Sequence, residues 1–166
     1  MSSTTSRFTI MPAGQDDVPL VLSLIRELAA YEQLAHEVVA TEALLHEALF
    51  GLSAVAHAVV ARDTDGTPAG FALYFFNFST FVGRPGLYLE DLFVRPEFRK
   101  HGLGRQLLAH LASTAVERGC GRMEWSVLNW NETALRVYRA IGATPMTEWT
   151  VQRLTGDALE ALAASR

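Results

Sequence analysis

A chain of 166 residues with 49% hydrophobic and 19% charged residues has the size and composition of one globular domain. Its net charge of −4 argues against non-specific nucleic-acid binding, and its single cysteine, Cys120, excludes an intrachain disulfide. No apolar run reaches the roughly 18 residues that indicate a membrane span, so we expect a cytoplasmic protein that partners neither nucleic acid nor membrane. Residues 1–6 are expected to be a disordered lead to one domain over residues 7–166.

The first part of the chain predicts a strand and two helices. Residues 7–11 read as the strand. Apolar residues at helical spacing over residues 18–29 predict the first helix. Thr41 is a typical N-cap for the second helix, which Gly51 closes.

A run of strands is expected next. The turn sequence at residues 63–66, Asp-Thr-Asp-Gly, predicts a hairpin between strands at 54–61 and 69–78, with 87–94 as the third antiparallel strand. This pattern predicts a mixed α/β fold, with a central mixed, mostly antiparallel sheet flanked by helices. The remaining elements are expected to be a helix ending at 118, a strand at 122–128, a helix at 131–141, a strand at 149–154 and a helix at 157–164.

The most informative stretch joins the strand at 87–94 to the helix that follows it. Gly102 and Gly104 lie where the helix begins, and Arg99 and Lys100 precede them. The first N–H groups of a helix lack intrahelical partners, and glycine lets an anion approach the backbone closely. The stretch therefore predicts a phosphate site, with an ordinary helix start as the alternative.

The spacing of these glycines excludes two familiar phosphate loops. A mononucleotide P-loop requires Gly-x-x-x-x-Gly-Lys-Ser/Thr, which the chain lacks. A dinucleotide-binding loop requires a third small residue at the position of Leu107.

Arg99-x-x-Gly102-x-Gly104 resembles the pyrophosphate-binding signature of the GCN5-related N-acetyltransferase (GNAT) superfamily, in which this loop holds the diphosphate of acetyl-CoA. Within the superfamily, residues 8–154 are similar to the spermidine/spermine (diamine) N-acetyltransferases. The resemblance implies that the strands at 87–94 and 122–128 splay apart to admit the pantetheine arm. The matching stretches are 27–32, 87–94, 130–132, and Tyr138 followed by 142–143.

The same resemblance implies catalytic roles. Glu90 matches a glutamate that acts as base through water, or orients the amine. Tyr138 matches the general acid, and it follows Asn131 by two helical turns, so both share a helix face. The plainer alternatives are structural. Glu90 could be a carboxylate hydrogen-bonded in a polar network, Tyr138 a core aromatic residue, and Asn131 a helix N-cap. Asp91 is interpreted as structural, because neighbours on a strand point to opposite faces.

Contacts with acetyl-CoA, the co-substrate, are expected from two segments. The backbone of the strand at Leu92, Phe93 and Val94 would pair with the pantetheine amides, and Phe93 N–H would serve the oxyanion. The remaining expected contacts are Arg99, Lys100, His101, Gly102, Leu103, Gly104, Arg105, Asn131, Thr133 and Ala134.

Expected contacts with the amine rest on weaker matches. Phe81 stands where the mammalian polyamine enzymes have tryptophan, Ser79 where they have aspartate, and Glu124 where they have histidine. The charge of the pocket, and hence the choice between a polyamine and a thialysine-like amine, is left open. The expected substrate residues are Tyr31, Glu32, Glu90, Phe81, Glu124, Trp130 and Glu148.

Three alternatives remain at this stage. The domain could bind acyl-CoA without catalysis, as a sensor, or could acetylate a protein or an antibiotic.

The five histidines show no metal-ligand spacing, so no metal is expected. The resemblance also implies a homodimer.

Overall fold

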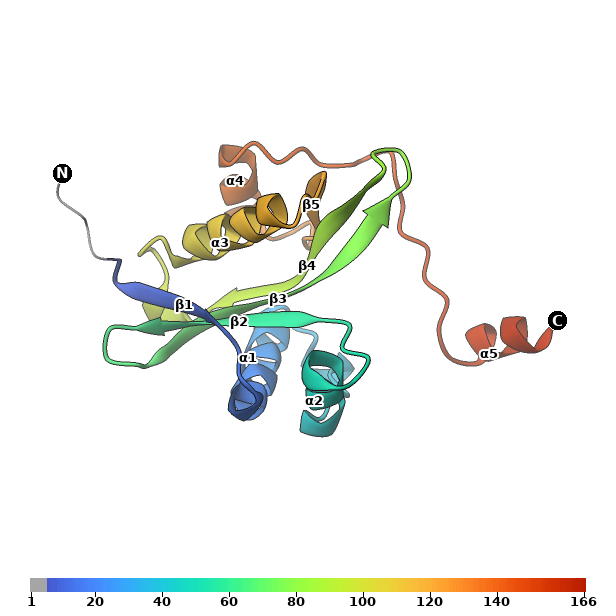
Figure 1. Cartoon of the computed structure of the whole chain (residues 1–166), viewed down its shortest axis with the longest axis horizontal. Helices are drawn as coiled ribbons and strands as arrows, with labels where there is room; N and C mark the ends of the chain where they lie inside the picture. The colour runs from blue at the N-terminus through green and yellow to red at the C-terminus, as the bar shows by residue number, and fades with distance from the viewer. Residues whose placement is uncertain (1–5) are drawn as a thin grey trace. The chain divides into compact units, whose positions relative to one another are not determined.

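The computed structural model describes residues 6–166 (Figure 1). Residues 1–5 of the expected lead lie outside the described residues. The chain divides into two compact units, one ending at Ser126 and the other spanning Val127–Arg166.

The first unit is built on a five-stranded sheet in the order β1-β2-β3-β4-β5. The first four strands pair antiparallel, while β5 pairs parallel to β4. The predicted turn joins β2 to β3, with Gly66 at a φ of 85°, which glycine adopts without strain. The predicted mixed, mostly antiparallel sheet is confirmed. The strands are β1 Phe8–Pro12, β2 His57–Asp63, β3 Pro68–Ser79, β4 Arg84–Val94 and β5 Arg122–Trp125.

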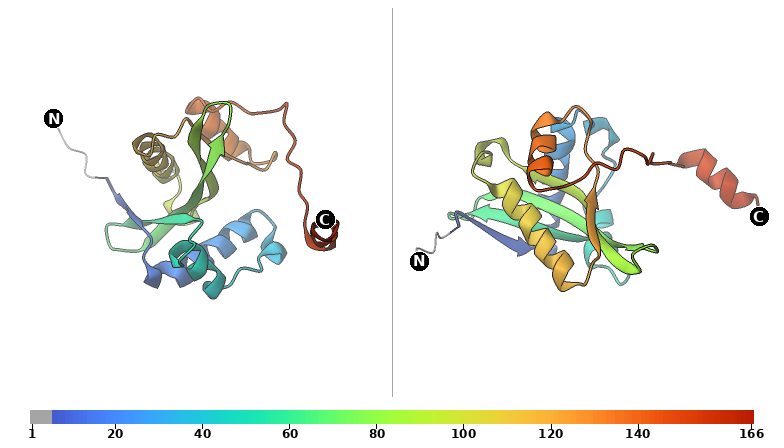
Figure 2. Two further views of the ribbon diagram at one scale, coloured as in Figure 1. Left: turned by 45° about the vertical axis from the view of Figure 1, so that its right-hand side comes forward. Right: turned by 90° about the horizontal axis from the view of Figure 1, so that it is seen from above.

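Helices cover both faces of this sheet, with α1 and α2 on one face and α3 on the other (Figures 1 and 2). Thr41 caps α2, because its hydroxyl accepts a hydrogen bond from the N–H of Leu44, as predicted. These helices are α1 Val18–Tyr31, α2 Glu42–Phe50 and α3 Leu103–Glu117, with short 3-10 turns at η1 Gln15–Asp17, η2 Ala35–Glu37 and η3 Pro96–Phe98.

Two apolar layers hold the first unit together. On one face, Val21, Leu24 and Leu28 of α1 pack with Phe71 and Phe93 of the sheet. On the other face, α3 buries a stripe of five apolar residues, while Val116, which its helical spacing also assigns to the stripe, is exposed. Each fully buried leucine, valine or phenylalanine side chain contributes roughly 1.5–3 kcal/mol to the stability of the fold. The stripe is Leu103, Leu107, Leu108, Leu111 and Ala115.

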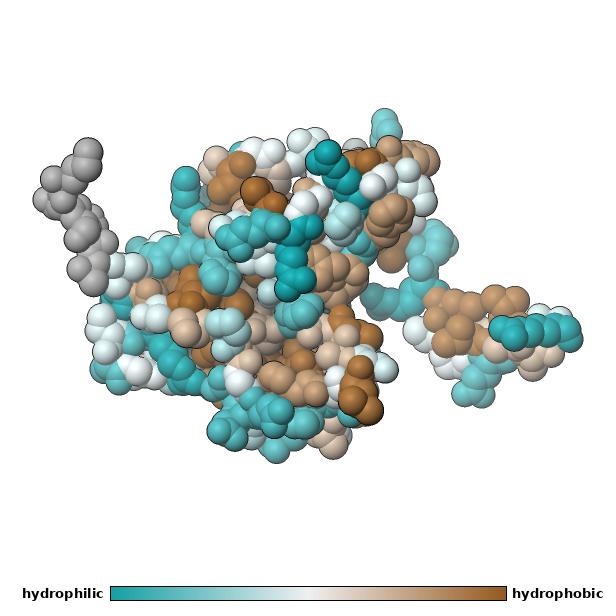
Figure 3. All heavy atoms as spheres, viewed as in Figure 1, coloured by the Kyte–Doolittle hydropathy of each residue, from teal (hydrophilic) through white to brown (hydrophobic). Residues whose placement is uncertain are grey.

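The second unit contains two helices, α4 Glu132–Ala140 and α5 Gly156–Ala164, both predicted. The predicted strand at 149–154 is wrong: these residues form no strand. Within residues 127–166 there is no other strand to pair with it, and an isolated strand leaves its backbone hydrogen bonds unmade. Apolar side chains of α5, including Leu159 and Leu162, are exposed (Figure 3). No helix within residues 6–166 is both long and apolar enough to cross a bilayer.

Candidate functional site

The carboxylates of Glu90 and Asp91 lie at a bulge in β4. Leu73 of β3 is opposite Asp91, but the next residue, Tyr74, is opposite Leu89, so Glu90 is an extra residue in β4. A bulge bends its strand and re-aims the side chains around it. The expectation that Glu90 and Asp91 point to opposite faces assumes strict alternation along the strand, which the extra residue interrupts here.

The bulge brings several negative charges together. Burial, and then the charges of Glu90 and Glu32, raise the pKa of Asp91 to about 6. Burial also raises the pKa of Glu32, which follows the last residue of α1. We call Glu32, Glu90 and Asp91 the acidic cluster. The sequence predicts a structural role for Asp91. The signal for the acidic cluster is the pair of adjacent carboxylates in an otherwise apolar strand.

Next to the acidic cluster, β4 loses its neighbour on one side. The ladder with β5 runs from Gly86 opposite Arg122 to Leu89 opposite Trp125, while β4 continues to Val94. Within the part of the chain that the structure describes, no strand pairs with this edge of β4 beyond Leu89. β5 itself ends at Trp125, three residues before its predicted end. An unpaired strand edge offers backbone N–H and C=O groups to an extended ligand.

The loop after β4 is fixed by Arg99. Its Nε donates a hydrogen bond to the carbonyl oxygen of Val94 at 2.9 Å. Its guanidinium lies 4.7 Å from the ring centre of Tyr31 and 5.6 Å from that of Phe93. Tyr31, expected at the substrate, therefore lies against the positive charge of the expected cofactor loop.

The start of α3 has the properties of an anion site. Gly102 is the N-cap residue, with a φ of 80°, and no side chain caps the helix within the described residues. A Cβ added to Gly104 would meet no atom closer than 4.0 Å, so protein packing does not require glycine there. Leu103, expected to contact the cofactor, is a core residue whose backbone N–H alone is available. Lys100, His101 and Arg105 are exposed beside the helix start.

Glu124 is paired with a positive charge. Its Oε2 lies 2.9 Å from Nε of Arg122. Glu124 is opposite Tyr88, two residues before the bulge, and the Tyr88 hydroxyl is hydrogen-bonded to Ser126 Oγ at 2.8 Å. The acidic group that stands where the mammalian polyamine enzymes have histidine is thus paired with a neighbouring positive charge.

Phe81 and Ser79 are not placed at the acidic cluster. Ser79 is buried, and its hydroxyl accepts a hydrogen bond from the N–H of Val82 within the β3–β4 turn. Phe81, at the tip of this hairpin, is 94% exposed. Ser79 is six residues along β3 from Leu73, the residue opposite Asp91, which corresponds to about 20 Å of strand.

In the second unit, Asn131 caps α4 and its Oδ1 accepts a hydrogen bond from the N–H of Ala134 at 3.2 Å. The N-cap that the sequence offered as the plainer role of Asn131 is thus present, and it leaves the expected role at the cofactor open. Thr133 and Ala134 form the first turn of α4, and Tyr138 lies two turns from the cap on the same side, half-buried. Trp130 precedes the helix, and Glu148 is exposed.

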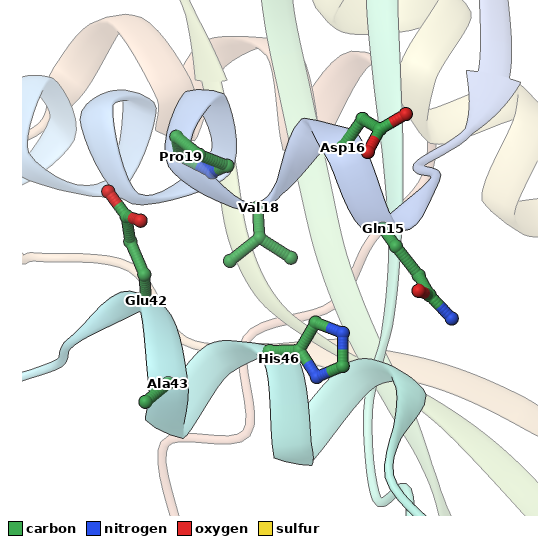
Figure 4. Close-up of a pocket in the computed structure, with 7 residues that line it drawn as sticks. All are labelled: Gln15, Asp16, Val18, Pro19, Glu42, Ala43 and His46. Atoms are coloured by element: carbon green, nitrogen blue, oxygen red, sulfur yellow. The ribbon is translucent and has the colours of Figure 1, made fainter.

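Another hollow lies elsewhere in the first unit. A groove of about 410 Å³ runs between the start of α1 and α2, and contains none of the expected site residues. Figure 4 shows Val18 and His46 between the two helices, with the carboxylates of Asp16 and Glu42 toward opposite ends of the groove.

Within residues 6–166, no three His, Cys, Asp or Glu side chains are grouped so that they could hold a metal ion.

Comparison with known proteins agrees with these features. Residues 23–143 match the model of the "Acetyltransferase (GNAT) family". The chain is 38% identical over 164 residues to thialysine N-epsilon-acetyltransferase of Bos taurus, covering 93% of this chain and 96% of that protein. It is 34% identical over 194 aligned residues to L-ornithine N5-acetyltransferase of Arabidopsis thaliana, covering 90% and 85% of the two chains.

A solved structure shows the same fold. An integron cassette protein from the mobile metagenome of V. cholerae has a TM-score of 0.79 and 28% identity, covering 97% of this chain and 100% of that chain. The family matches residues 23–143, most of the chain, and this range includes the acidic cluster, the Arg99–Gly104 loop and α4. The chain therefore belongs to the GNAT family and is an acetyl-CoA-dependent N-acetyltransferase.

Proposed function

We propose that the protein transfers the acetyl group of acetyl-CoA directly to a primary amine of a small cationic molecule, either a polyamine or diamine or a thialysine-like amino acid. The observation that carries this proposal is the acidic cluster beside the unpaired edge of β4. Clustered carboxylates attract a cationic amine, and the strand edge would present the acyl donor to it. Relatives named for thialysine and ornithine acetylation support an amine of this size.

The residues present fit the co-substrate. The unpaired edge at Leu92–Val94 would pair with the pantetheine amides, as an added strand does. The uncapped start of α3 would bind the pyrophosphate, because its N–H groups and helix dipole favour an anion, and the space at Gly104 allows close approach. Lys100, His101 and Arg105 would add charge near the phosphates, with Asn131, Thr133 and Ala134 supplying contacts from α4.

Catalysis requires two proton movements. A free primary amine has a pKa near 10.4, so most of it is protonated at pH 7 and must lose a proton before its lone pair attacks the thioester carbon. Glu90 would accept that proton through a water molecule. Asp91, with its pKa raised to about 6, is ionised at neutral pH and would share this role or bind the ammonium group.

The carbon–sulfur bond then breaks as the amide forms. Tyr138 would donate a proton to the departing sulfur, and the N–H of Phe93 would stabilise the oxyanion that precedes cleavage. The proposed catalytic pair is therefore Glu90 and Tyr138. Asp91, which lies beside Glu90 at the bulge, would assist Glu90.

The amine would be held by Glu32 and Glu124, with Tyr31, Trp130 and Glu148 as further contacts. Phe81 is too far along the hairpin to serve the acidic cluster of its own chain. In the homodimer that the family resemblance implies, it would instead serve the site of the second copy.

The test is free-thiol release from acetyl-CoA with a panel of spermidine, spermine, putrescine, thialysine, lysine, an aminoglycoside and a histone-like peptide. Turnover with the polyamines or the amino acids is expected, and turnover with the peptide or the aminoglycoside alone would contradict the proposed substrate class. Tight acetyl-CoA binding by calorimetry without any turnover would favour a sensor. No acetyl-CoA binding would overturn the assignment of the Arg99–Gly104 loop.

A further inference from the structure

A second cavity lies in the first unit where β2 begins. Its volume is about 250 Å³, and its walls include Leu49 and Phe50 of α2, His57 and Tyr74 of the sheet, and Arg118. Arg118 follows the last residue of α3, whereas the Arg99–Gly104 loop precedes the first. The 15 residues of α3 span about 22 Å, so this cavity is separate from the proposed acetyl-CoA site.

Tyr74, one of the residues that line this cavity, carries a hydroxyl group. Its side chain is only 8% exposed, yet its hydroxyl has no hydrogen-bond partner within residues 6–166. That hydroxyl is not sealed in the core, since the only buried, unpartnered side-chain oxygen or nitrogen of the described residues is Asn77 Oδ1. The Tyr74 hydroxyl is therefore a donor open to an incoming ligand.

Two further polar groups surround it. The imidazole of His57 stacks on the ring of Tyr74 with centres 5.3 Å apart. The guanidinium of Arg118 lies 5.5 Å from the ring centre of Phe76, which also contacts His57. Within the described part of the chain, Arg118 forms no ion pair, and none of the residues lining the cavity is acidic.

The charge of Arg118 acts on both neighbours. Burial, and then this charge, lower the pKa of His57, so the imidazole is neutral at pH 7. Burial raises the pKa of Tyr74 by more than the charge of Arg118 lowers it, so the hydroxyl keeps its proton. The cavity therefore presents one uncompensated cation, one hydroxyl donor, a neutral ring and an apolar wall.

This combination selects a ligand. A cation would be repelled by Arg118 and would find no carboxylate. A carboxylate can accept two parallel hydrogen bonds from a guanidinium and another from a hydroxyl. A flat apolar body can stack on the His57 imidazole beside Phe50. The volume is below the roughly 300 Å³ of sites for drug-sized ligands, so the ligand is small.

We propose that this cavity is a binding site for a small aromatic carboxylate, held by Arg118 and the Tyr74 hydroxyl and stacked on His57. The site is independent of the proposed acetyl transfer. Phenylacetate is a suitable probe, and phenylacetamide, of the same shape but without charge, is its matched control.

The experiment titrates each probe into the full chain and follows the imidazole resonances of His57 and the backbone amides by NMR. Phenylacetate should shift resonances at His57, Tyr74 and Arg118 with saturable binding, and phenylacetamide should bind at least about tenfold more weakly. Arg118→Gln should weaken phenylacetate binding by about tenfold or more, and Tyr74→Phe by several-fold. Arg26→Gln, which removes an exposed arginine of α1, should leave it unchanged.

Because Arg118 is exposed, its substitution should leave the fold intact, which the amide spectrum of the variant checks directly. Equal binding of the acid and the amide, or equal binding by Arg118→Gln and the unmodified chain, would overturn the proposal. So would the absence of saturable shifts around His57.

Discussion

The guanidinium of Arg95 forms a two-point ion pair with the carboxylate of Glu27, with Nε 2.9 Å from Oε2 and Nη2 2.7 Å from Oε1. Its Nη1 also donates a hydrogen bond to the carbonyl oxygen of Pro68 at 3.0 Å. The pair ties α1 to the residue that follows β4, next to the Arg99–Gly104 loop. It therefore holds together α1 and β4, the two elements that carry the acidic cluster.

Replacing Glu27 with Gln should reduce the free energy of unfolding at pH 7 by about 1–2 kcal/mol, because the charged hydrogen bonds are lost. The hydrogen bond from Arg95 lowers the pKa of Glu27, so this stability is present above the unfolded-state pKa and lost as the pH falls through the lowered value. Urea unfolding at several pH values measures it. Glu160→Gln, an exposed residue of α5, is the control; an equal loss in both variants would contradict the role of the pair.

Gly104→Ala should separate folding from cofactor binding. The added Cβ meets no protein atom closer than 4.0 Å, and alanine favours a helix, so the free energy of unfolding should rise by about 0.5 kcal/mol. Acetyl-CoA binding, measured by calorimetry, should weaken at least about tenfold, because the methyl group occupies the space needed by the pyrophosphate. Ala112→Gly on the exposed face of α3 should show the reverse pattern, with lower stability and unchanged binding. Unchanged affinity in Gly104→Ala would mean that no ligand approaches this backbone.

Asp91→Asn should stabilise the protein at neutral pH and slow the reaction. The folded-state pKa of Asp91 is raised to about 6 from 3.8, so ionising it above pH 6 costs up to about 3 kcal/mol. The gain in thermal stability should therefore be present above pH 6, shrink as the pH falls and vanish below pH 3.8. Unmodified enzyme should show kcat/KM rising through an apparent pKa near 6, and that rise should be lost in the variant. A stability gain that does not change with pH would show that Asp91 does not titrate there.

Tyr138→Phe should lower kcat by about 10²–10⁴-fold, the usual contribution of general acid catalysis, with KM for acetyl-CoA within about twofold. Steady-state kinetics with saturating amine measure both constants, and a thermal unfolding curve checks that α4 is intact. Equal turnover would remove Tyr138 from the mechanism.

Arg122→Gln should favour polycationic substrates, because it removes the partner of Glu124 and leaves a net negative charge near the acidic cluster. KM for spermidine should fall by about two- to fivefold, as expected for a partly exposed charge. KM for thialysine, which also carries a carboxylate, should change less. The opposite order would place Glu124 outside the amine site.

The local features of the fold could be predicted from the sequence. The caps at Thr41 and Asn131 and the Asp-Thr-Asp-Gly turn depend on interactions within a few residues, and all are confirmed. The predicted strand at 149–154 is wrong, because a strand needs a pairing partner and the residues of the segment itself do not reveal one.

The candidate site was harder to predict for the same reason. The loop at Arg99–Gly104 was found because its spacing is carried by consecutive residues. The bulge at Glu90 depends on how β3 is paired with β4, and the proximity of Asp91 to Glu32 joins residues far apart in the chain, so neither has a local sequence pattern. Likewise, the ion pair of Glu124 with Arg122 and the distance of Phe81 from the bulge follow from the sheet register.

The extra residue in β4 also decides which layer each half of the strand stabilises. Before it, Leu87 and Leu89 lie opposite Phe76 and Tyr74, on the α3 face; after it, Phe93 lies opposite Phe71 and packs against α1. One strand thus supplies apolar side chains to both layers in turn. Insertion or deletion of one residue in this short stretch would turn Phe93 toward the wrong helix, so chain length here is as constrained as residue identity.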